Sequence, residues 1–319
     1  MKYIAAKETY IRFMKASGKT DCTIESYGRT LNNFEAFLAE QGIENVEDVK
    51  PLTVAAYMEK RSEEISATSL NLELTHLRCF FEYLFDMEVI DRSPVKKSIT
   101  VNKSALREQR NKEYDGIISK RELLSILANH HPANTHKAQI SRNRALLILF
   151  LTTGLRNESI RELRVGDLDF EHSIIRVREA KGGKSGDAPL CDVAKVLVKA
   201  YLASHTDLTA DDYLFGFVSK DGEWKPFSRQ QMSNTVEAAI KSYLPDRAGI
   251  RSHALRHSFA SLMSNSGMSD GEVSLLLFHS DGTGAAVTRR YISDDRTELF
   301  AKVNSIFNRI CKGFLALPV

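Results

Sequence analysis

The chain has 319 residues, 43% of them hydrophobic, and carries 44 Lys and Arg against 41 Asp and Glu, a formal net charge of +3. This length exceeds what one ordinary hydrophobic core organises, so it predicts two domains. No apolar run approaches the roughly 18 residues that a membrane span requires, and the first residues lack the apolar segment of a signal peptide. We therefore expect a cytoplasmic protein that does not contact a membrane.

The cysteines are few and widely separated in the sequence. Cys22, Cys79, Cys191 and Cys311 form no Cys-x-x-Cys pair, which argues against a zinc ribbon and a disulfide framework. We expect all four to be buried small side chains.

The first 95 residues predict helices joined by short turns. Residues 23–38 carry apolar side chains at spacings of three and four, and Thr20 or Asp21 is placed to cap this helix. Residues 68–89 repeat the pattern, and Pro94 prevents the helix from continuing. The two apolar stripes, both expected to face a core, are Ile24, Tyr27, Leu31, Phe34 and Leu38, and Leu70, Leu74, Leu77, Phe81 and Leu84.

Residues 96–115 differ from the sequence on either side. They carry 6 basic residues against 3 acidic ones and lack sustained apolar periodicity. This predicts an interdomain linker. Two interpretations stay open for it, a solvated loop and a strap along a nucleic-acid backbone.

Residues 116–319 predict a second, mostly helical domain. Ser119 and Glu122 have capping-box spacing, as do Ser269 and Glu272, which predict the start of a later helix. The apolar run Ala145–Leu151 predicts a buried helix that ends at Gly154. Strand signals are confined to one region, where residues 173–179 and 187–190 predict a small antiparallel hairpin. The expected fold class is therefore mainly α with a small antiparallel sheet.

The end of the chain predicts a strongly amphipathic helix. Its apolar positions are Leu299, Val303, Ile306, Phe307, Ile310 and Phe314. Two alternatives stay open: the helix covers its own domain, or it docks into a neighbouring protomer.

Basic side chains recur in the second domain in a pattern suited to an anionic substrate. His253, Arg256 and His257 lie at i, i+3 and i+4 and should share one helical face. Two histidines at this spacing can bind zinc, but no His-Glu-x-x-His motif and no third ligand is evident, so we expect no metal. Arg156 follows the buried helix, which can hold its planar guanidinium rigidly against a phosphodiester.

Tyr291 is the only tyrosine after His253. A phenol oxygen becomes a useful nucleophile toward phosphate only where nearby cations and hydrogen-bond donors neutralise the reacting group. The basic residues upstream of Tyr291 are of the kind that this chemistry needs.

These residues together resemble the tyrosine recombinase (phage integrase) family. The matching motifs are Thr153-Gly-Leu-Arg156 with Ile160, Leu163 and Asp167; the hairpin lysine Lys181; His253-Ala-Leu-Arg256-His257; His279; Tyr291; and, in the first domain, Leu74-Thr-His-Leu77-Arg78-Cys-Phe80-Phe81-Glu-Tyr83-Leu84. The resemblance implies a helical core-binding domain in residues 1–95, a basic linker in 96–115 and a catalytic domain in 116–319.

The sequence departs from the family pattern at several positions. Ser159 stands where the family usually has an acidic residue, with Glu158 beside it, and Phe278 replaces the glycine before His279. Ala180 replaces the glycine before Lys181. Tyr291 follows His279 at a longer interval than the family commonly shows.

The resemblance implies a site-specific DNA recombinase that cleaves and rejoins strands through a 3′-phosphotyrosyl intermediate, for integration, excision or resolution. Tyr291 would attack the scissile phosphate, Arg156 and Arg256 would clamp it, and Lys181 would protonate the leaving 5′-oxygen. His253 would assist proton transfer or hydrogen-bond the transition state, and His279 occupies the remaining matched position. Neither ATP nor any other cofactor is implied, because the phosphotyrosyl bond retains the energy of the phosphodiester.

The implied partners are double-stranded DNA with a specific core site and further copies of this chain, as a tetramer on two DNA sites, in the nucleoid of a bacterium or archaeon. The candidate DNA contacts are Arg78, Lys96, Lys97, Lys103, Arg107, Arg176, Arg178 and Lys184. Residues 1–95 hold 11 Lys and Arg against 16 Asp and Glu, so their basic groups must share one face to bind DNA.

Two other functions stay open on the sequence alone. A type IB topoisomerase uses a similar site as a monomer. A DNA-binding accessory protein with a degraded site is suggested by Ser159, Phe278 and the long interval before Tyr291.

Overall fold

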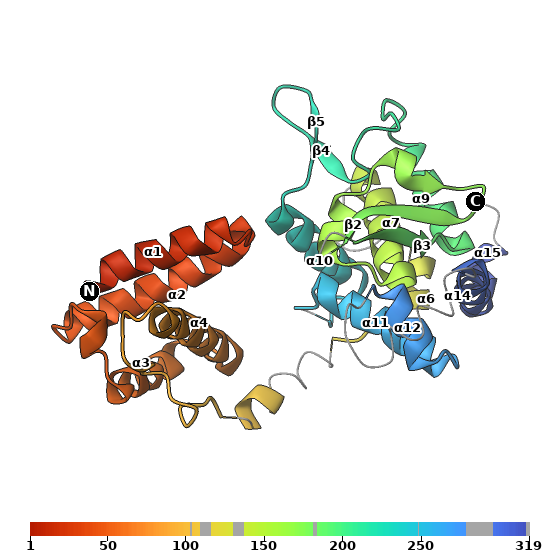
Figure 1. Cartoon of the computed structure of the whole chain (residues 1–319). Helices are drawn as coiled ribbons and strands as arrows, with labels where there is room; N and C mark the ends of the chain where they lie inside the picture. Colours follow the sequence, from red (N-terminus) through yellow and green to blue (C-terminus); the bar gives the residue numbers. More distant parts are fainter. Residues whose placement is uncertain are drawn as a thin grey trace. The chain divides into compact units, whose positions relative to one another are not determined.

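The computed structural model describes residues 1–102, 104–108, 116–129, 137–180, 184–247, 249–278 and 296–316. The chain divides into two compact units, Met1–Lys112 and Glu113–Val319, which Figure 1 shows with their helices and strands labelled. Within the described ranges, no helix is both long enough and apolar enough to cross a lipid bilayer.

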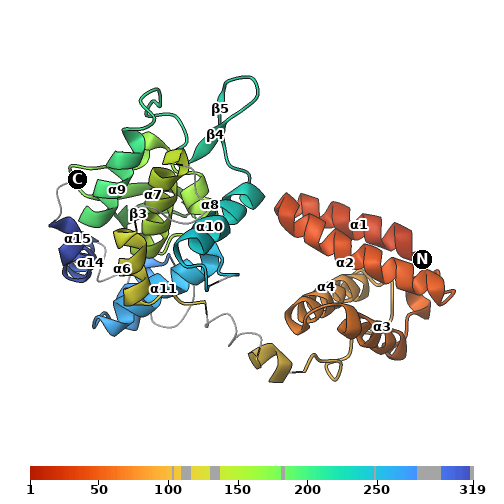
Figure 2. The same ribbon diagram turned by 180° about the vertical axis from the view of Figure 1, so that it is seen from behind.

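In its described residues, the first unit has four long helices, one short 3₁₀ turn and a short helical stretch at residues 104–108. Its elements are α1 (Tyr3–Ala16), α2 (Asp21–Glu40), η1 (Val46–Asp48), α3 (Pro51–Glu64) and α4 (Ala67–Asp86). Helices α1 and α2 lie side by side in both views of the ribbon, and α4 packs against α1, α2 and α3 (Figures 1 and 2).

The two helices predicted in this unit are confirmed. Thr20 caps α2, because its hydroxyl accepts a hydrogen bond from the backbone N–H of Thr23. The expected stripes are buried except at Tyr27, which is half-buried. The second helix ends at Asp86 rather than at Val89, because Glu88 adopts a left-handed φ of 56° that no α-helix contains.

The start of the basic segment packs on the first unit. Val101 is buried in its core, and Ile99 and Leu106 pack against that core from the outside. Residues 104–108 are helical. These apolar contacts hold the first part of residues 96–115 against the four-helix unit.

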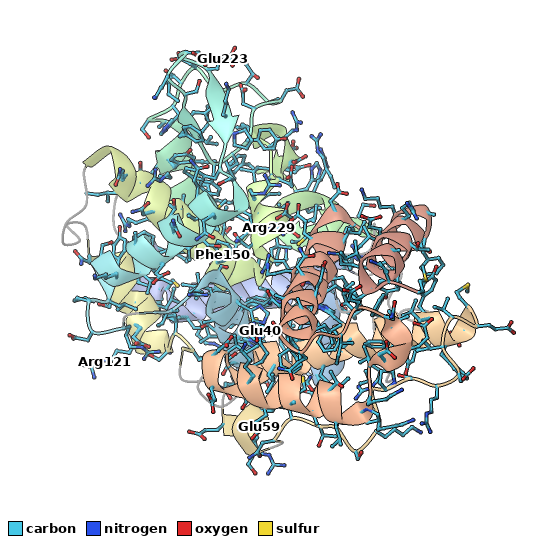
Figure 3. The ribbon with its side chains drawn as sticks, turned by 90° about the vertical axis from the view of Figure 1, so that its left-hand side faces the viewer. Glu40, Glu59, Arg121, Phe150, Glu223 and Arg229 are labelled. Atoms are coloured by element: carbon cyan, nitrogen blue, oxygen red, sulfur yellow. The ribbon has the colours of Figure 1, made fainter. Side chains whose placement is uncertain are left out.

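The second unit surrounds one buried helix. Helix α7 (Lys137–Thr153) contains the predicted apolar run Ala145–Leu151, every residue of which is at most 1% exposed. Helices α9 (Asp192–Leu202), α10 (Arg229–Tyr243) and α11 (Ser252–Asn265) pack against it. Phe150, labelled in Figure 3, is one of its fully buried side chains. The chain leaves the helix at Gly154, whose φ of +62° favours glycine.

The other helices described in this unit are short or peripheral. They are α6 (Lys120–Ala128), α8 (Asn157–Arg161), η2 (Val165–Asp167), α12 (Asp270–Leu276), α14 (Arg296–Ile310) and α15 (Lys312–Leu315). The capping boxes at Ser119–Glu122 and Ser269–Glu272 both form, with reciprocal side-chain to backbone hydrogen bonds. These local signals therefore place the starts of α6 and α12 correctly.

The predicted hairpin belongs to a three-stranded antiparallel sheet. Strands β2 (Ile174–Ala180) and β3 (Lys184–Pro189) pair as expected, and β1 (Leu168–Asp169) adds to the edge of β2. Ile175 and Val177 are buried, so Arg176 and Arg178 on the same strand point away from the core.

The expectation that strands occur in only one region is wrong. A second hairpin pairs β4 (Gly216–Val218) with β5 (Trp224–Pro226). Strands of three residues are too short for an alternating pattern to appear in the sequence. The indole N–H of Trp224 donates to the carbonyl of Tyr213 at 2.9 Å and ties the hairpin to the unit. Figure 3 shows Glu223 at the projecting end of this hairpin.

The C-terminal helix packs on its own chain. Leu299, Val303 and Phe307 are buried in the core of the second unit. The amides of Asn304 and Asn308 both donate to the carboxylate of Asp192 at the start of α9, at 2.9 and 2.7 Å. This helix therefore covers its own domain in the single chain, and its docking into a neighbouring protomer stays a prediction.

The cysteines only partly follow the sequence expectation. None of the four forms a disulfide. Cys191 and Cys311 are buried, but Cys79 is half-buried and Cys22 is exposed. The prediction of four buried cysteines is therefore wrong for Cys22, which lies in the first turn of α2 on its solvent side. The spacing of cysteines in the sequence does not determine whether each one is buried.

Candidate active site

One pocket of the second unit brings together three of the six predicted catalytic residues. It has a volume of about 280 Å³. Its lining residues are Leu155, Arg156, Asn157, Glu158, Arg229, Ser252, His253 and Arg256. They come from the turn after α7, from the start of α8 and from the first turns of α10 and α11. The N-terminal end of the 14-residue helix α11 adds the partial positive charge of its free backbone N–H groups.

Arg256 is held rigidly at the base of this pocket. It is 5% exposed, and its guanidinium donates from Nη1 to the carbonyl of Gly154 at 2.7 Å and from Nη2 to the carbonyl of Leu277 at 2.6 Å. Burial, and then the like charge of Arg156, lower the pKa of Arg256 to about 10. A bound anion would stabilise the charged form of Arg256 and so offset both effects, which makes the pocket suited to an anionic group such as phosphate.

Arg156 lies at the junction of the α7 turn and α8. Its backbone is extended, at the N-cap position of α8, and its carbonyl accepts a hydrogen bond from the N–H of Ile160. Gly154, two residues earlier, fits closely: an added Cβ there would lie 2.4 Å from Cδ1 of Phe259 and 2.7 Å from Cδ2 of Leu277. The turn that presents Arg156 is therefore fixed by packing against α11 and the end of α12.

Glu158 and Ser159 have different environments. Ser159 is buried, whereas Glu158 lines the pocket and accepts hydrogen bonds from Arg161 and from Nε of Arg229 at 3.1 Å. Partial burial opposes ionisation of Glu158, but the hydrogen bonds and charges of Arg161 and Arg229 outweigh it and lower its pKa. The acidic group at this site is thus an ionised carboxylate one position before the one that the family pattern uses.

Arg229 was not singled out from the sequence. It occupies the first turn of α10, which begins at a capping box formed by Ser228 and Gln231. That capping box is visible in the sequence and places an arginine at a helix start. The contact with Glu158 joins residues 71 positions apart, and no local pattern predicts it.

The two histidines of α11 are in contact. The rings of His253 and His257 are nearly perpendicular, with centroids 4.6 Å apart. His253 is exposed and lines the pocket, whereas His257 is half-buried and does not. The shared helical face expected for His253 and His257 is confirmed by this ring contact.

At the end of α12, Phe278 occupies the position where the family pattern has glycine. Phe278 adopts a left-handed φ of 51°, a conformation that costs a residue with a side chain roughly 1 to 2 kcal/mol. Its ring is half-buried against the core of the second unit. The backbone thus keeps a glycine-like conformation although the residue is not glycine.

Four of the predicted site residues, Lys103, Lys181, His279 and Tyr291, lie outside the described residues. Lys184 is described only by its backbone, which begins β3 and pairs with Ala180. Their predicted roles stay predictions. In the described part of the chain, no three His, Cys, Asp or Glu side chains are arranged to hold a metal ion.

The candidate DNA contacts lie on both units. Lys96, Lys97 and Arg107 are exposed, and Arg78 is half-buried on α4. On β2, Arg178 donates to the buried carboxylate of Asp167 at 2.7 Å, and Arg176 donates to Asp169 at 2.8 Å. These two arginines face outward, but each is paired with a carboxylate of its own domain.

Two known families match the chain. The Phage integrase family matches residues 117–298, and the family described as "Phage integrase, N-terminal SAM-like domain" matches residues 8–88. Among known proteins, the tyrosine recombinase XerD of Shewanella oneidensis is 30% identical over 273 residues, which cover 83% of this chain and 85% of the relative.

Solved structures with the same fold are found as well. A lambda integrase dimer bound to a COC′ core site has a TM-score of 0.64 and 19% identity, covering 89% of this chain and 97% of that one. A lambda integrase tetramer bound to a Holliday junction has a TM-score of 0.63 and 18% identity, covering 89% and 79%. At these identities the likeness shows the fold alone.

Proposed function

This chain belongs to the phage integrase family, and we propose that it is a tyrosine-type site-specific DNA recombinase that cleaves and rejoins strands through a 3′-phosphotyrosyl intermediate. The observation that carries the proposal is the pocket that Arg156, His253 and Arg256 line together. It offers two guanidinium groups and a histidine around a space of about 280 Å³, the chemistry that a phosphodiester requires.

In the proposed reaction, the Oη atom of Tyr291 forms a bond to the scissile phosphorus, and the bond from phosphorus to the 5′-oxygen breaks. The electron pair leaves with the 5′-oxygen, which takes a proton from Lys181. The phenolic proton of Tyr291 passes to a base, and our candidate for this base is His253, which lines the pocket. Attack by a 5′-hydroxyl of another strand reverses these steps. No bond energy is lost, so the reaction needs neither ATP nor another cofactor.

Arg156 and Arg256 have distinct parts in this proposal. Arg256 is fixed by two backbone carbonyls, so its position is set before DNA arrives, and Arg156 extends from a turn that is packed from behind. Preorganised donors of this kind stabilise a transition state by roughly 3 kcal/mol each, which is two to three powers of ten in rate.

We propose double-stranded DNA with a specific core site as the substrate, and further copies of this chain as partners. The exposed cations Lys96, Lys97 and Arg107 would contact the DNA backbone. The lambda integrase structures contain a dimer on a core site and a tetramer on a Holliday junction, which supports a tetramer on two sites. Because its proposed substrate is DNA, we propose that the protein acts in the cytoplasm, at the nucleoid of a bacterium or archaeon.

A suicide substrate tests this function. The core site is first obtained by selecting bound duplexes from a random-sequence library. A nick just downstream of the cleavage position then lets the short fragment that carries the released 5′-hydroxyl diffuse away, which traps the adduct. We expect a covalent protein–DNA product under denaturing electrophoresis. A mobility shift without a covalent product would instead identify a DNA-binding accessory protein. Relaxation of supercoiled plasmids that lack the core site would identify a topoisomerase.

A further inference from the structure

Gly186, in the middle of β3, is approached closely by two side chains from distant parts of the sequence. An added Cβ at Gly186 would lie 2.8 Å from Cε1 of Phe278 and 3.0 Å from Nη1 of Arg296. Gly186 itself pairs with Val177 of β2. Carbon atoms that are not bonded do not approach to 2.8 Å, so the ring of Phe278 occupies the space that any side chain at Gly186 would need.

Phe278 is joined through its backbone to the pocket. Leu277 is the residue before Phe278, and its carbonyl accepts the hydrogen bond from Nη2 of Arg256 at 2.6 Å. The backbone N–H of Phe278 donates to the carbonyl of Leu275 at 3.1 Å. Its left-handed φ of 51° would suit glycine better. Unlike glycine, phenylalanine has a ring, and this ring lies against β3 at Gly186.

Two of the residues that meet at Gly186 flank the segment of the chain that contains Tyr291. Phe278 immediately precedes residues 279–295, which include Tyr291, and Arg296 immediately follows them. Both flanking residues therefore meet one point on β3. That point is five residues after Lys181, on the hairpin strand that leads away from it.

We propose that Gly186, Phe278 and Arg296, here called the Gly186 cluster, position the hairpin that bears Lys181 relative to Arg256 and to the segment that bears Tyr291. These are positioning residues, because none of them is required to touch the reacting atoms. The proposal rests on the proposed function, in which Lys181 protonates the 5′-oxygen that Tyr291 displaces. A displacement of about 1 Å in such a group can lower a rate by roughly 100-fold.

A double-mutant cycle on the full-length protein tests the contact. Gly186→Ala places a methyl group against the ring and should slow single-turnover cleavage of the nicked core-site duplex by roughly 10- to 100-fold. Phe278→Ala should also slow it, because the hairpin loses its support. Adding Gly186→Ala to Phe278→Ala should slow the reaction no further, since the ring that the methyl group would meet is gone. Gly313→Ala is the matched control, because no atom lies within 4 Å of its added Cβ.

A second substrate shows what the cluster positions. When sulfur replaces the bridging 5′-oxygen of the scissile phosphate, the leaving thiolate needs no proton, because thiols have a pKa of about 8.5. Gly186→Ala, Phe278→Ala and Lys181→Ala should then all cleave at nearly the wild-type rate. A defect that is merely structural would persist on this substrate, and thermal unfolding of each variant identifies any that does not fold.

The outcomes separate this proposal from the proposed function. If Gly186→Ala slows cleavage equally in the wild-type protein and in the Phe278→Ala variant, the contact does not position anything and the proposal is wrong. If sulfur restores Lys181→Ala but not Gly186→Ala, the cluster does not act through Lys181, while the proposed chemistry stands. If Lys181→Ala itself stays slow, the assignment of the acid is wrong, and with it the role given to the cluster.

Discussion

Arg256 is bonded to the turn that carries the other arginine of the pocket: its Nη1 donates to the carbonyl of Gly154 at 2.7 Å, two residues before Arg156. A second bond, from Nη2 to Leu277, ties the same guanidinium to the end of α12. One buried side chain thus joins three segments that are far apart in the sequence. Its removal should affect both the fold and the chemistry.

Arg256→Lys separates the charge of this residue from its geometry. A lysine keeps the positive charge but cannot reach both carbonyls in the planar arrangement that the guanidinium provides. We expect unfolding free energy to fall by about 2 kcal/mol, because a buried carbonyl loses its donor, and cleavage to slow by roughly 100-fold or more. Chemical denaturation and single-turnover cleavage measure the two effects. Arg309→Lys, on the exposed side of α14, should change neither.

Gly154→Ala tests how tightly the turn before Arg156 is packed. The added Cβ would be 2.4 Å from the ring of Phe259 in a backbone of φ +62°, so both a clash and conformational strain are expected. We expect a loss of roughly 3 kcal/mol in unfolding free energy. Gly267→Ala is the control, because its φ is +93° and its Cβ would meet no atom within 4 Å. Equal losses in the two variants would show that packing at Gly154 contributes nothing beyond strain.

The two outward-facing arginines of β2 should differ in their effect on stability. Arg178 pairs with Asp167, whose side chain is 4% exposed, whereas Arg176 pairs with Asp169, which is 16% exposed. Arg178→Ala leaves a buried carboxylate without its cation and should lower the free energy of unfolding by about 1 to 2 kcal/mol. Arg176→Ala should lower it by less than about 1 kcal/mol. Denaturant unfolding decides this. A larger loss for Arg176→Ala would contradict the account.

The same two variants test the predicted DNA contacts. If Arg176 and Arg178 each neutralise a phosphate, each alanine variant should lower the dependence of DNA affinity on salt by about one counterion. Binding titrations over a range of salt concentrations measure this slope. An unchanged slope in both variants would remove these residues from the DNA interface and leave them as partners of Asp169 and Asp167.

The first unit should show a pH dependence centred on Glu73. This buried carboxylate accepts hydrogen bonds from Tyr57 at 2.7 Å and from Nη2 of Arg61 at 2.7 Å. Burial raises its pKa, but the hydrogen bonds and charge of Arg61, with Tyr57, outweigh burial and lower the pKa below its ordinary value. A carboxylate whose pKa is lower in the folded state than in the unfolded state stabilises the fold at pH values above its unfolded-state pKa, which is about 4.3 for glutamate. This contribution is lost as the pH falls through the folded-state pKa.

Glu73→Gln removes that titration and keeps the size of the side chain. We expect the variant to be less stable than the wild type at pH 7, with a gap in unfolding free energy that narrows as the pH falls below about 4.3. Thermal unfolding at a series of pH values measures the gap. Glu25→Gln, on the exposed side of α2, is the matched control. A gap at Glu73 that stays constant with pH would mean that the carboxylate charge does not stabilise this unit.

Sequence patterns predict the parts of this fold that depend on near neighbours. The apolar stripe of α2, the buried run in α7 and the capping boxes at Ser119 and Ser269 involve residues at most a few turns apart, and all of them form. The strands β4 and β5 escaped prediction because three residues give no periodicity. The second bond of Arg256, to Leu277, also depends on packing between separate elements and has no local signature.

In the candidate site, too, the features set by near neighbours in the sequence are predicted, and those set by packing between distant elements are not. Motif spacing identified Arg156, His253 and Arg256, which line one pocket. It did not identify Arg229, whose place in the pocket depends on how α10 packs beside α8, nor the contact between Phe278 and Gly186. Both arise where elements distant in the sequence meet.

The nucleophile is the central claim, and Tyr291→Phe tests it most directly. The wild-type protein and the variant are incubated with the nicked core-site duplex, and covalent protein–DNA product and simple binding are measured side by side. Removing one hydroxyl should leave DNA affinity unchanged and abolish the covalent product. A covalent product that persists in the variant at the wild-type level would contradict the assignment of Tyr291 and require another nucleophile.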